Sequence, residues 1–263
     1  MKTLSTPVLC LRSLAWAGLA SAIIANSPAA ITTYISKFDQ QAIEEAYTSG
    51  TTFLTDDFGT KAGNRGVFTS FTGSTTGITY TGTGSPQIQA NDQYGGNGTG
   101  NYLGVASGAV VTATFAAPVE YFGLYISALD GNNVIKLYNG STLLLTFNAS
   151  SLTTLLPNNP TSTVRAIDNT LYNTDQYYGQ PVTGSNASEP YAYVSFFATA
   201  GTKITSAVLS ESVAIFETDN YSIRTTAPAV ATSLVLVPEP GTTSLMILSG
   251  TALAWMLSRR RTA

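Results

Sequence analysis

The chain has 263 residues, of which 44% are hydrophobic and only 10% are charged, and it contains one cysteine and no histidine. This length is enough for one large domain, or two small ones, with a hydrophobic core. The missing histidines exclude Ser-His-Asp and Cys-His catalysis and any zinc site with histidine ligands.

Residues 1–30 have the order of features of a secretory signal peptide. Lys2 and Arg12 precede an apolar run over residues 13–24, and small residues follow around position 30. The run is shorter than the roughly 20 residues of a spanning helix, which disfavours the alternative of an uncleaved anchor. We therefore expect export, with cleavage after one of the small residues Ala22, Ala29 or Ala30.

The C-terminal tail predicts a membrane-spanning helix. Pro238, Glu239 and Pro240 precede an uncharged run over residues 242–258, and the arginines Arg259, Arg260 and Arg261 follow it. A run of this length can cross a bilayer, and an arginine cluster after it stays cytoplasmic under the positive-inside rule. The rest of the chain then lies outside the cytoplasm.

This tail closely resembles the PEP-CTERM sorting signal of exported proteins of Gram-negative bacteria. The resemblance covers residues 238–261 and rests on three elements in fixed order: the Pro-Glu-Pro motif, the apolar helix and the basic cluster. It implies that exosortase, a membrane-embedded transpeptidase, recognises the Pro-Glu-Pro motif and processes the tail, and that the arginines act as the stop signal. The alternative is an ordinary single-pass anchor with a fortuitous Pro-Glu-Pro.

Between the two ends, residues 31–237 carry seven basic and fourteen acidic side chains, a net charge of −7. Nucleic-acid binding needs clustered Lys and Arg to neutralise phosphates, so this balance excludes a nucleic-acid partner. It is compatible with cation binding.

The body predicts an all-β fold. Runs of β-branched and aromatic residues are separated by Gly, Asn, Asp and Pro. The clearest cover residues 67–72, 110–115, 119–126, 134–138, 142–147, 191–197, 204–209 and 213–216. Eight or more strands of this kind indicate an antiparallel β-sandwich over residues 31–227, followed by a linker over residues 228–237.

Local patterns add detail to this sandwich. Residues 38–47 place apolar side chains at helical spacing, which predicts one short N-terminal helix. Asp130-Gly131 and Asn139-Gly140 suit tight hairpins and predict a three-stranded meander over residues 119–147. Residues 119–126 are apolar on both faces, which is typical of a central strand covered on both sides. Short strands are expected at Gln87-Ile88 and Tyr102-Leu103, and long loops over residues 157–190.

The body also resembles, more diffusely, the jelly-roll-like β-sandwich modules that precede PEP-CTERM tails. The similar stretches are residues 55–59, 101–104, 122–125, 193–197 and 213–221. The resemblance implies a jelly-roll-like sandwich without a settled activity.

Carboxylates are the candidate reactive or metal-binding groups. In similar modules, acidic residues near the first and last strands hold a structural Ca²⁺, which prefers six to eight oxygen ligands. By this resemblance, the candidate ligands are Asp56, Asp57, Glu217 and Asp219. The simpler alternative is that these residues cap loops and turns and bind nothing.

We expect a non-catalytic protein of the cell surface or extracellular matrix, first anchored in the inner membrane and then processed by exosortase. Its expected role is binding or structure in a biofilm, with exopolysaccharide or matrix proteins as partners. The alternative is a secreted, polysaccharide-active enzyme that uses a pair of carboxylates.

Overall fold

The computed structural model describes residues 30–42, 53–59, 66–96, 100–179, 187–199 and 201–226. The predicted signal peptide, the linker and the sorting tail, including Pro238 to Pro240 and Arg259 to Arg261, lie outside them. No helix in the described ranges is long and apolar enough to cross a membrane.

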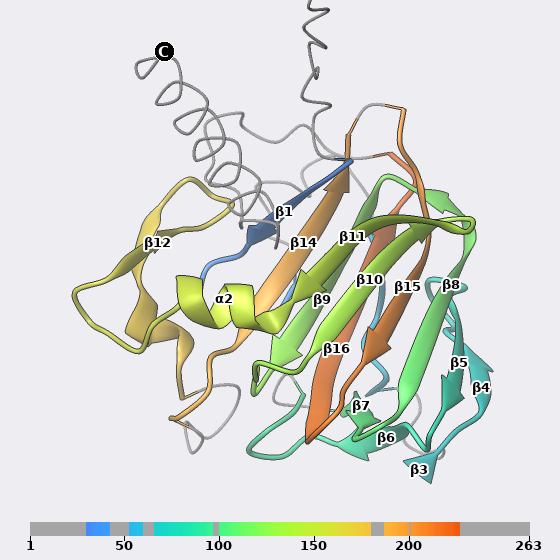
Figure 1. Cartoon of the computed structure of the whole chain (residues 1–263), viewed down its shortest axis with the longest axis horizontal. Coiled ribbons are helices and arrows are strands. Elements are labelled where there is room, and N and C mark those ends of the chain that lie inside the picture. The colour runs from blue at the N-terminus through green and yellow to red at the C-terminus, as the bar shows by residue number, and fades with distance from the viewer. Residues whose placement is uncertain are drawn as a thin grey trace, which may run out of the picture.

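Two antiparallel sheets form the body of the molecule, the smaller one in front of the larger one in Figure 1. The larger sheet has the order β1 (Ile31–Ile35), β14 (Ala192–Ala198), β9 (Tyr121–Ser127), β16 (Ile215–Arg224), β7 (Asn101–Ala106), β6 (Gln87–Ala90) and β3 (Gly66–Val67), and β2 (Leu54–Asp56) also pairs with β16. The smaller sheet has the order β11 (Thr142–Asn148), β10 (Val134–Asn139), β15 (Ile204–Ser210), β8 (Val110–Val119), β5 (Thr79–Thr83) and β4 (Ser70–Thr72). The predicted all-β sandwich is confirmed.

The loop region over residues 157–190 contains a separate hairpin. Its strands are β12 (Thr163–Arg165) and β13 (Leu171–Asn173), and the short 3₁₀ helix η2 (Thr174–Tyr177) follows. The buried Tyr177 donates a hydrogen bond of 2.9 Å from its hydroxyl to the carbonyl oxygen of Ser36. This bond ties the region to the chain that follows β1.

The core lies between the two sheets, and a second apolar layer covers the far side of the larger sheet. Strand β9 shows both, because alternate side chains point to opposite faces. Phe122, Leu124 and Ile126 belong to the core, whereas Tyr121 and Tyr125 join a second buried cluster. We call the face that carries this second cluster the outer face. The prediction that this strand is central and covered on both sides is confirmed.

The predicted meander over residues 119–147 is wrong in its first strand. The hairpin of β10 and β11 at Asn139-Gly140 is present, with Gly140 at a φ of 57°. Strand β9, however, belongs to the larger sheet, and β10 pairs with β15 instead. The segment that contains Asp130-Gly131 therefore crosses from the larger sheet to the smaller one.

The predicted N-terminal helix also requires correction in its first half. Phe38 and Asp39 form a turn, residues 40–42 are not helical, and residues 43–47 lie outside the described part of the chain. A helix is found instead at α2 (Ala149–Leu155), whose Ala149 and Leu152 are buried.

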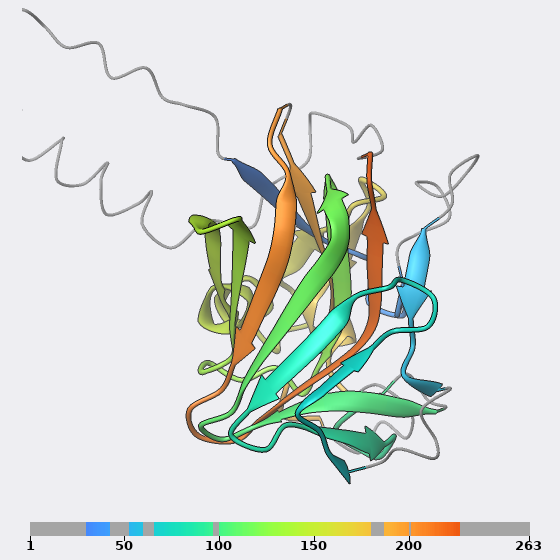
Figure 2. The same cartoon turned by 90° about the vertical axis from the view of Figure 1, so that its right-hand side faces the viewer.

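The chain enters and leaves the sandwich at the same end. Ile31 pairs with Ala198 of β14, and Tyr121 of β9 pairs with Arg224 at the end of β16. Because neighbouring strands are antiparallel, these residues lie in one row across the larger sheet. Figure 2 shows the start of β1 and the tip of β16 at the same end of the molecule. Glu217 and its partner Ser127 lie toward the opposite end.

Candidate functional site

Asp56 is a buried structural anchor. Its carboxylate accepts hydrogen bonds from the backbone N–H groups of Thr75 and Thr76, each at 3.3 Å, from the Thr76 hydroxyl and, at 3.1 Å, from the Tyr80 hydroxyl. A side chain at Gly73 would collide with it, since an added Cβ would lie 1.8 Å from the Asp56 Oδ2 atom. The carboxylate therefore holds the turn between β4 and β5 against β2.

Asp57, the next residue, points to solvent. Its Oδ1 atom accepts a hydrogen bond of 3.0 Å from the backbone N–H of Gly59, which closes a local turn. A shallow depression lies beside it, lined by both aspartates, Phe58, Phe71, Gly73, Ser74 and Thr75. The Asp56 carboxylate at this depression already accepts hydrogen bonds from four donors.

Glu217 and Asp219 lie on the outer face of β16. Phe216 and Thr218 alternate with them along the strand and point inward. Phe216 belongs to the core, and Thr218 donates a hydrogen bond to the Leu103 carbonyl oxygen. Asp219 accepts a hydrogen bond of 2.7 Å from the backbone N–H of Asn220. Asn220 has a φ of 49° and donates from Nδ2 to the Gln41 carbonyl oxygen at 2.6 Å.

The four predicted calcium ligands do not form one site. The expected neighbourhood is present, because β2 pairs with β16 and Asp56 lies opposite Tyr221. The register of β16 shifts between Asp219 and Ser222, however, and such a bulge changes which residues face inward. Tyr221 and Asp56 therefore face the core, whereas Glu217 and Asp219 face the other way.

Glu217 has a strongly perturbed carboxyl group. It is 7% exposed, and its Oε2 atom has no hydrogen-bond partner. Burial, and then the carboxylates of Glu189, Asp92 and Asp130, raise its pKa from 4.5 to about 9. A buried carboxyl in such surroundings holds its proton at neutral pH.

Loops from four parts of the chain bring these acids to one end of the sandwich, which we call the acidic end. It comprises Asp92, Asp130, Glu189, Glu211 and Glu217. Burial, followed by the charges of Glu211 and Glu189, raises the pKa of Asp130 despite a hydrogen bond from the Asn132 backbone. The acidic end lies opposite the end where the chain enters and leaves.

Glu211 and Asp92 have structural roles within this end. Glu211 Oε1 accepts hydrogen bonds from the backbone N–H groups of residues 212, 213 and 214, and its Oε2 accepts one of 2.7 Å from Asn133. Asp92 Oδ1 accepts from the backbone N–H groups of Tyr94 at 2.8 Å and Gly95 at 2.9 Å. Both residues fix tight loops.

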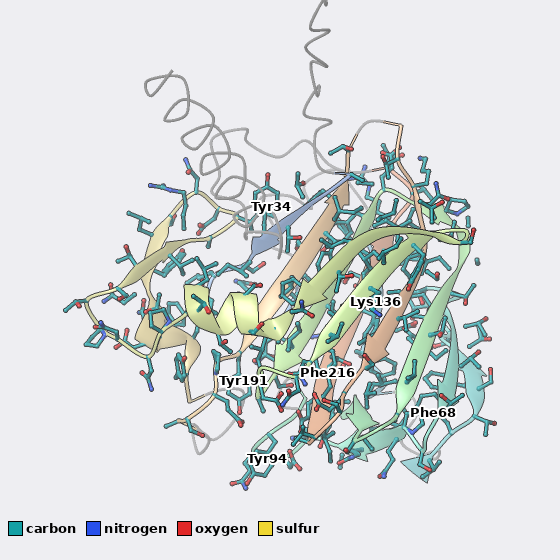
Figure 3. All side chains as sticks on the ribbon, in the orientation of Figure 1. Tyr34, Phe68, Tyr94, Lys136, Tyr191 and Phe216 are labelled. Carbon is teal, nitrogen blue, oxygen red and sulfur yellow. The ribbon has the colours of Figure 1, made fainter. Side chains whose placement is uncertain are left out.

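The loop over residues 91–96 lies across the outer face. Gly95 packs on the ring of Tyr102, where an added Cβ would lie 2.6 Å from the ring. Tyr191 donates a hydrogen bond of 3.3 Å from its hydroxyl to the Gln93 carbonyl oxygen. Figure 3 shows Tyr94 and Tyr191 toward the lower end of the molecule and Tyr34 of β1 toward the upper end.

Sequence reasoning selected Glu217 but missed its neighbours Asp92 and Glu189. Each of these acids lies in a Gly-, Asn- or Pro-rich loop next to a strand, which is a visible signal. Which loops share an end depends on the strand pairing, and the sequence pattern does not contain that pairing. Within the described ranges, no three Asp, Glu, His or Cys side chains are already arranged to hold a metal ion.

Comparison with protein-family models, with curated proteins and with solved structures finds no match to this chain.

Proposed function

We propose that the chain is an exported, non-catalytic protein of the cell surface or extracellular matrix, processed by exosortase, whose sandwich presents its acidic end to exopolysaccharide or matrix proteins. The observation that carries this proposal is that the first and last strands of the sandwich, β1 and β16, begin and end on the same side of it. Ile31 and Arg224 lie at one end of the sandwich, and the loops with Asp92, Asp130 and Glu189 lie at the other.

This arrangement suits a protein held through its C-terminal tail. The sorting-type tail follows β16, so an anchor at the tail leaves the opposite end of the sandwich facing away from the membrane. Loops at the end of a rigid β scaffold are a common place for a binding surface. Acidic loops there suit a partner that is cationic or is bridged by cations.

A jelly-roll-like topology is part of the same proposal. From β7 to β10 and again from β14 to β16, consecutive strands alternate between the sheets: β7, β9, β14 and β16 lie in the larger sheet, and β8, β10 and β15 lie in the smaller one. Such alternation is typical of jelly-roll sandwiches.

The enzymatic alternative has one feature in its favour, the raised pKa of Glu217, which a general acid would share. A glycosidase also needs a second carboxylate across a bound sugar. A carboxyl that is 7% exposed beneath a loop offers a sugar ring little surface. We therefore favour binding over catalysis.

The sorting half of the proposal is tested by deleting residues 238–263 in the native host. Surface fractionation and mass spectrometry of the exported protein give the location and the processed mass. We expect the intact chain to reach the surface in a shortened form, and the deletion variant to lose both processing and surface location. Glu239→Ala should reproduce this loss, and Asp57→Ala, a change in the body, should not. Unchanged location and processing in the deletion variant would contradict the proposal.

A further inference from the structure

Two paired residues at the acidic end each carry a buried oxygen atom without a hydrogen-bond partner. Glu217 of β16 and Ser127 of β9 are directly paired in the larger sheet, so their side chains share the outer face. Glu217 is 7% exposed and Ser127 is 0% exposed. Neither the Oε2 atom of Glu217 nor the Oγ atom of Ser127 has a hydrogen-bond partner.

Such a pair requires an explanation. Most buried polar side-chain atoms in proteins have at least one partner, because leaving one without a partner costs free energy. Position 104, on the other side of Glu217, is a glycine and offers no side chain. The Glu217 and Ser127 side chains thus lie on the same face of the sheet, and one oxygen atom of each has no hydrogen-bond partner.

More acidic groups surround this place. The backbone N–H of Leu129 donates to the carbonyl oxygen of Pro190 at 3.0 Å, which brings the loops of Asp130 and Glu189 together. Asp92 lies in the loop that packs on Tyr102. The ion pairs of the described residues join Lys37 to Asp39 and Lys203 to Glu120, so Glu217, Asp92 and Asp130 take part in neither.

We propose that the acidic end binds a divalent cation of the calcium type, which displaces the proton of Glu217 into solvent and takes the Glu217 carboxylate and the Ser127 hydroxyl as its inner protein oxygens. The loop carboxylates of Asp92, Asp130 and Glu189 supply further negative charge around it. Because three carboxylates do not already converge among the described residues, few of the ligands are side chains. Calcium accepts such sites, since backbone carbonyls and water complete its six to eight oxygens.

This site differs from the set predicted by sequence resemblance, of which it retains only Glu217. It also stands apart from the proposed function, because it concerns the folded body and is measured in vitro. A negative result in the sorting experiment would not contradict the cation site, and a negative result in the cation experiment would not contradict processing by exosortase.

Terbium luminescence tests the site directly. Terbium occupies calcium sites and emits when a nearby tyrosine absorbs light, and Tyr102 and Tyr125 flank Glu217 along the neighbouring strands β7 and β9. The full chain should show tyrosine-sensitised emission that calcium displaces. Glu217→Gln and Ser127→Ala should each weaken terbium binding by about tenfold or more. Asp57→Asn, which changes an exposed acid elsewhere, should leave binding unchanged.

A thermal melt with calcium or with chelator provides the second readout, because a ligand of the native state raises the melting temperature. Calcium should raise it for the wild type and for Asp57→Asn, and not for Glu217→Gln. If a change at the buried position prevents folding, Asp92→Asn in the exposed loop replaces it and should weaken binding. Equal terbium emission in the wild type and the Glu217 variant, or no calcium effect on the wild type, would overturn the proposal.

Discussion

Asp56 and Asp57 are adjacent in the sequence and have opposite roles in the structure. Asp56 accepts hydrogen bonds from two backbone N–H groups and two hydroxyls in a buried position, whereas Asp57 caps an exposed turn. Charge and position in the sequence are nearly identical for the two residues. Asp56 is the last residue of β2 and is buried, whereas Asp57 follows the strand and is exposed.

Replacing the two aspartates separately should therefore give very different stabilities. Asp56→Ala leaves the Tyr80 hydroxyl and the Thr76 groups without their acceptor, so we expect a loss of about 3 kcal/mol in the free energy of unfolding. Asp57→Ala should cost less than about 1 kcal/mol. Urea unfolding followed by circular dichroism measures both. Equal losses would show that Asp56 does not anchor the turn.

The buried Glu217 makes stability depend on pH. Its pKa is raised from 4.5 to about 9 in the folded state, so between these values the folded protein retains a proton that the unfolded chain releases. The unfolded state then binds fewer protons, and the free energy of unfolding falls as the pH rises through this window. The contribution of Glu217 to stability is fully present at acidic pH and is lost toward alkaline pH.

Comparison with Glu217→Gln isolates this contribution, since glutamine has a similar shape and does not titrate. In chelator, the melting temperature of the wild type should fall relative to that of the variant between about pH 5 and about pH 8. Asp57→Asn should follow the wild type across the same range. Parallel curves for the wild type and Glu217→Gln would mean that the carboxyl is not desolvated.

Among the elements, β9 shows best what a strand pattern predicts. Its apolar residues on both faces indicate a covered central strand, and the structure places it between β14 and β16. Its partners were not predictable, because the preference of β10 for β15 over β9 arises from long-range packing. The Asp130-Gly131 signal is consistent with either a hairpin or a crossing between sheets.

Strand position also predicts which leucines support the fold. Leu124 of β9 is 0% exposed in the core, and Leu143 of the edge strand β11 is 50% exposed. We expect Leu124→Ala to lower the free energy of unfolding by about 3 kcal/mol through lost burial and the cavity left behind. The same change at Leu143 should stay within about 0.5 kcal/mol. Chemical denaturation of both variants tests this, and similar losses would contradict the two-layer core.

The bulge at Asn220 accounts for the failure of the predicted calcium set. A regular strand would place residues 217, 219 and 221 on one face, and Asp56, opposite Tyr221, would join them. The residue with a positive φ turns Tyr221 into the core instead. In the sequence, Asp219-Asn220 is a pair that favours a turn, but β16 continues to Arg224.

At the scale of the whole molecule, the sandwich was predictable and its acidic end was not. Strand runs and glycine-rich turns indicate the fold class from local sequence alone. The acidic end depends on bringing Asp92, Asp130 and Glu189 together from separate loops, which requires the complete strand order. The proposed sorting tail is the reverse case, since the pattern that suggests it lies entirely in the sequence of residues 238–261.

The strand order also determines when the molecule can fold. Strand β16 is the last of the described strands in the sequence, yet it lies in the middle of the larger sheet, where it pairs with β9, β7 and β2. Strand β1 likewise cannot pair until β14 has been synthesised. Pairings this distant in sequence form slowly. A chain of this topology lacks its central strand until almost all of it has been synthesised, so the larger sheet is completed late. If the chain is exported as we propose, this delay keeps it unfolded while it passes through a translocation channel.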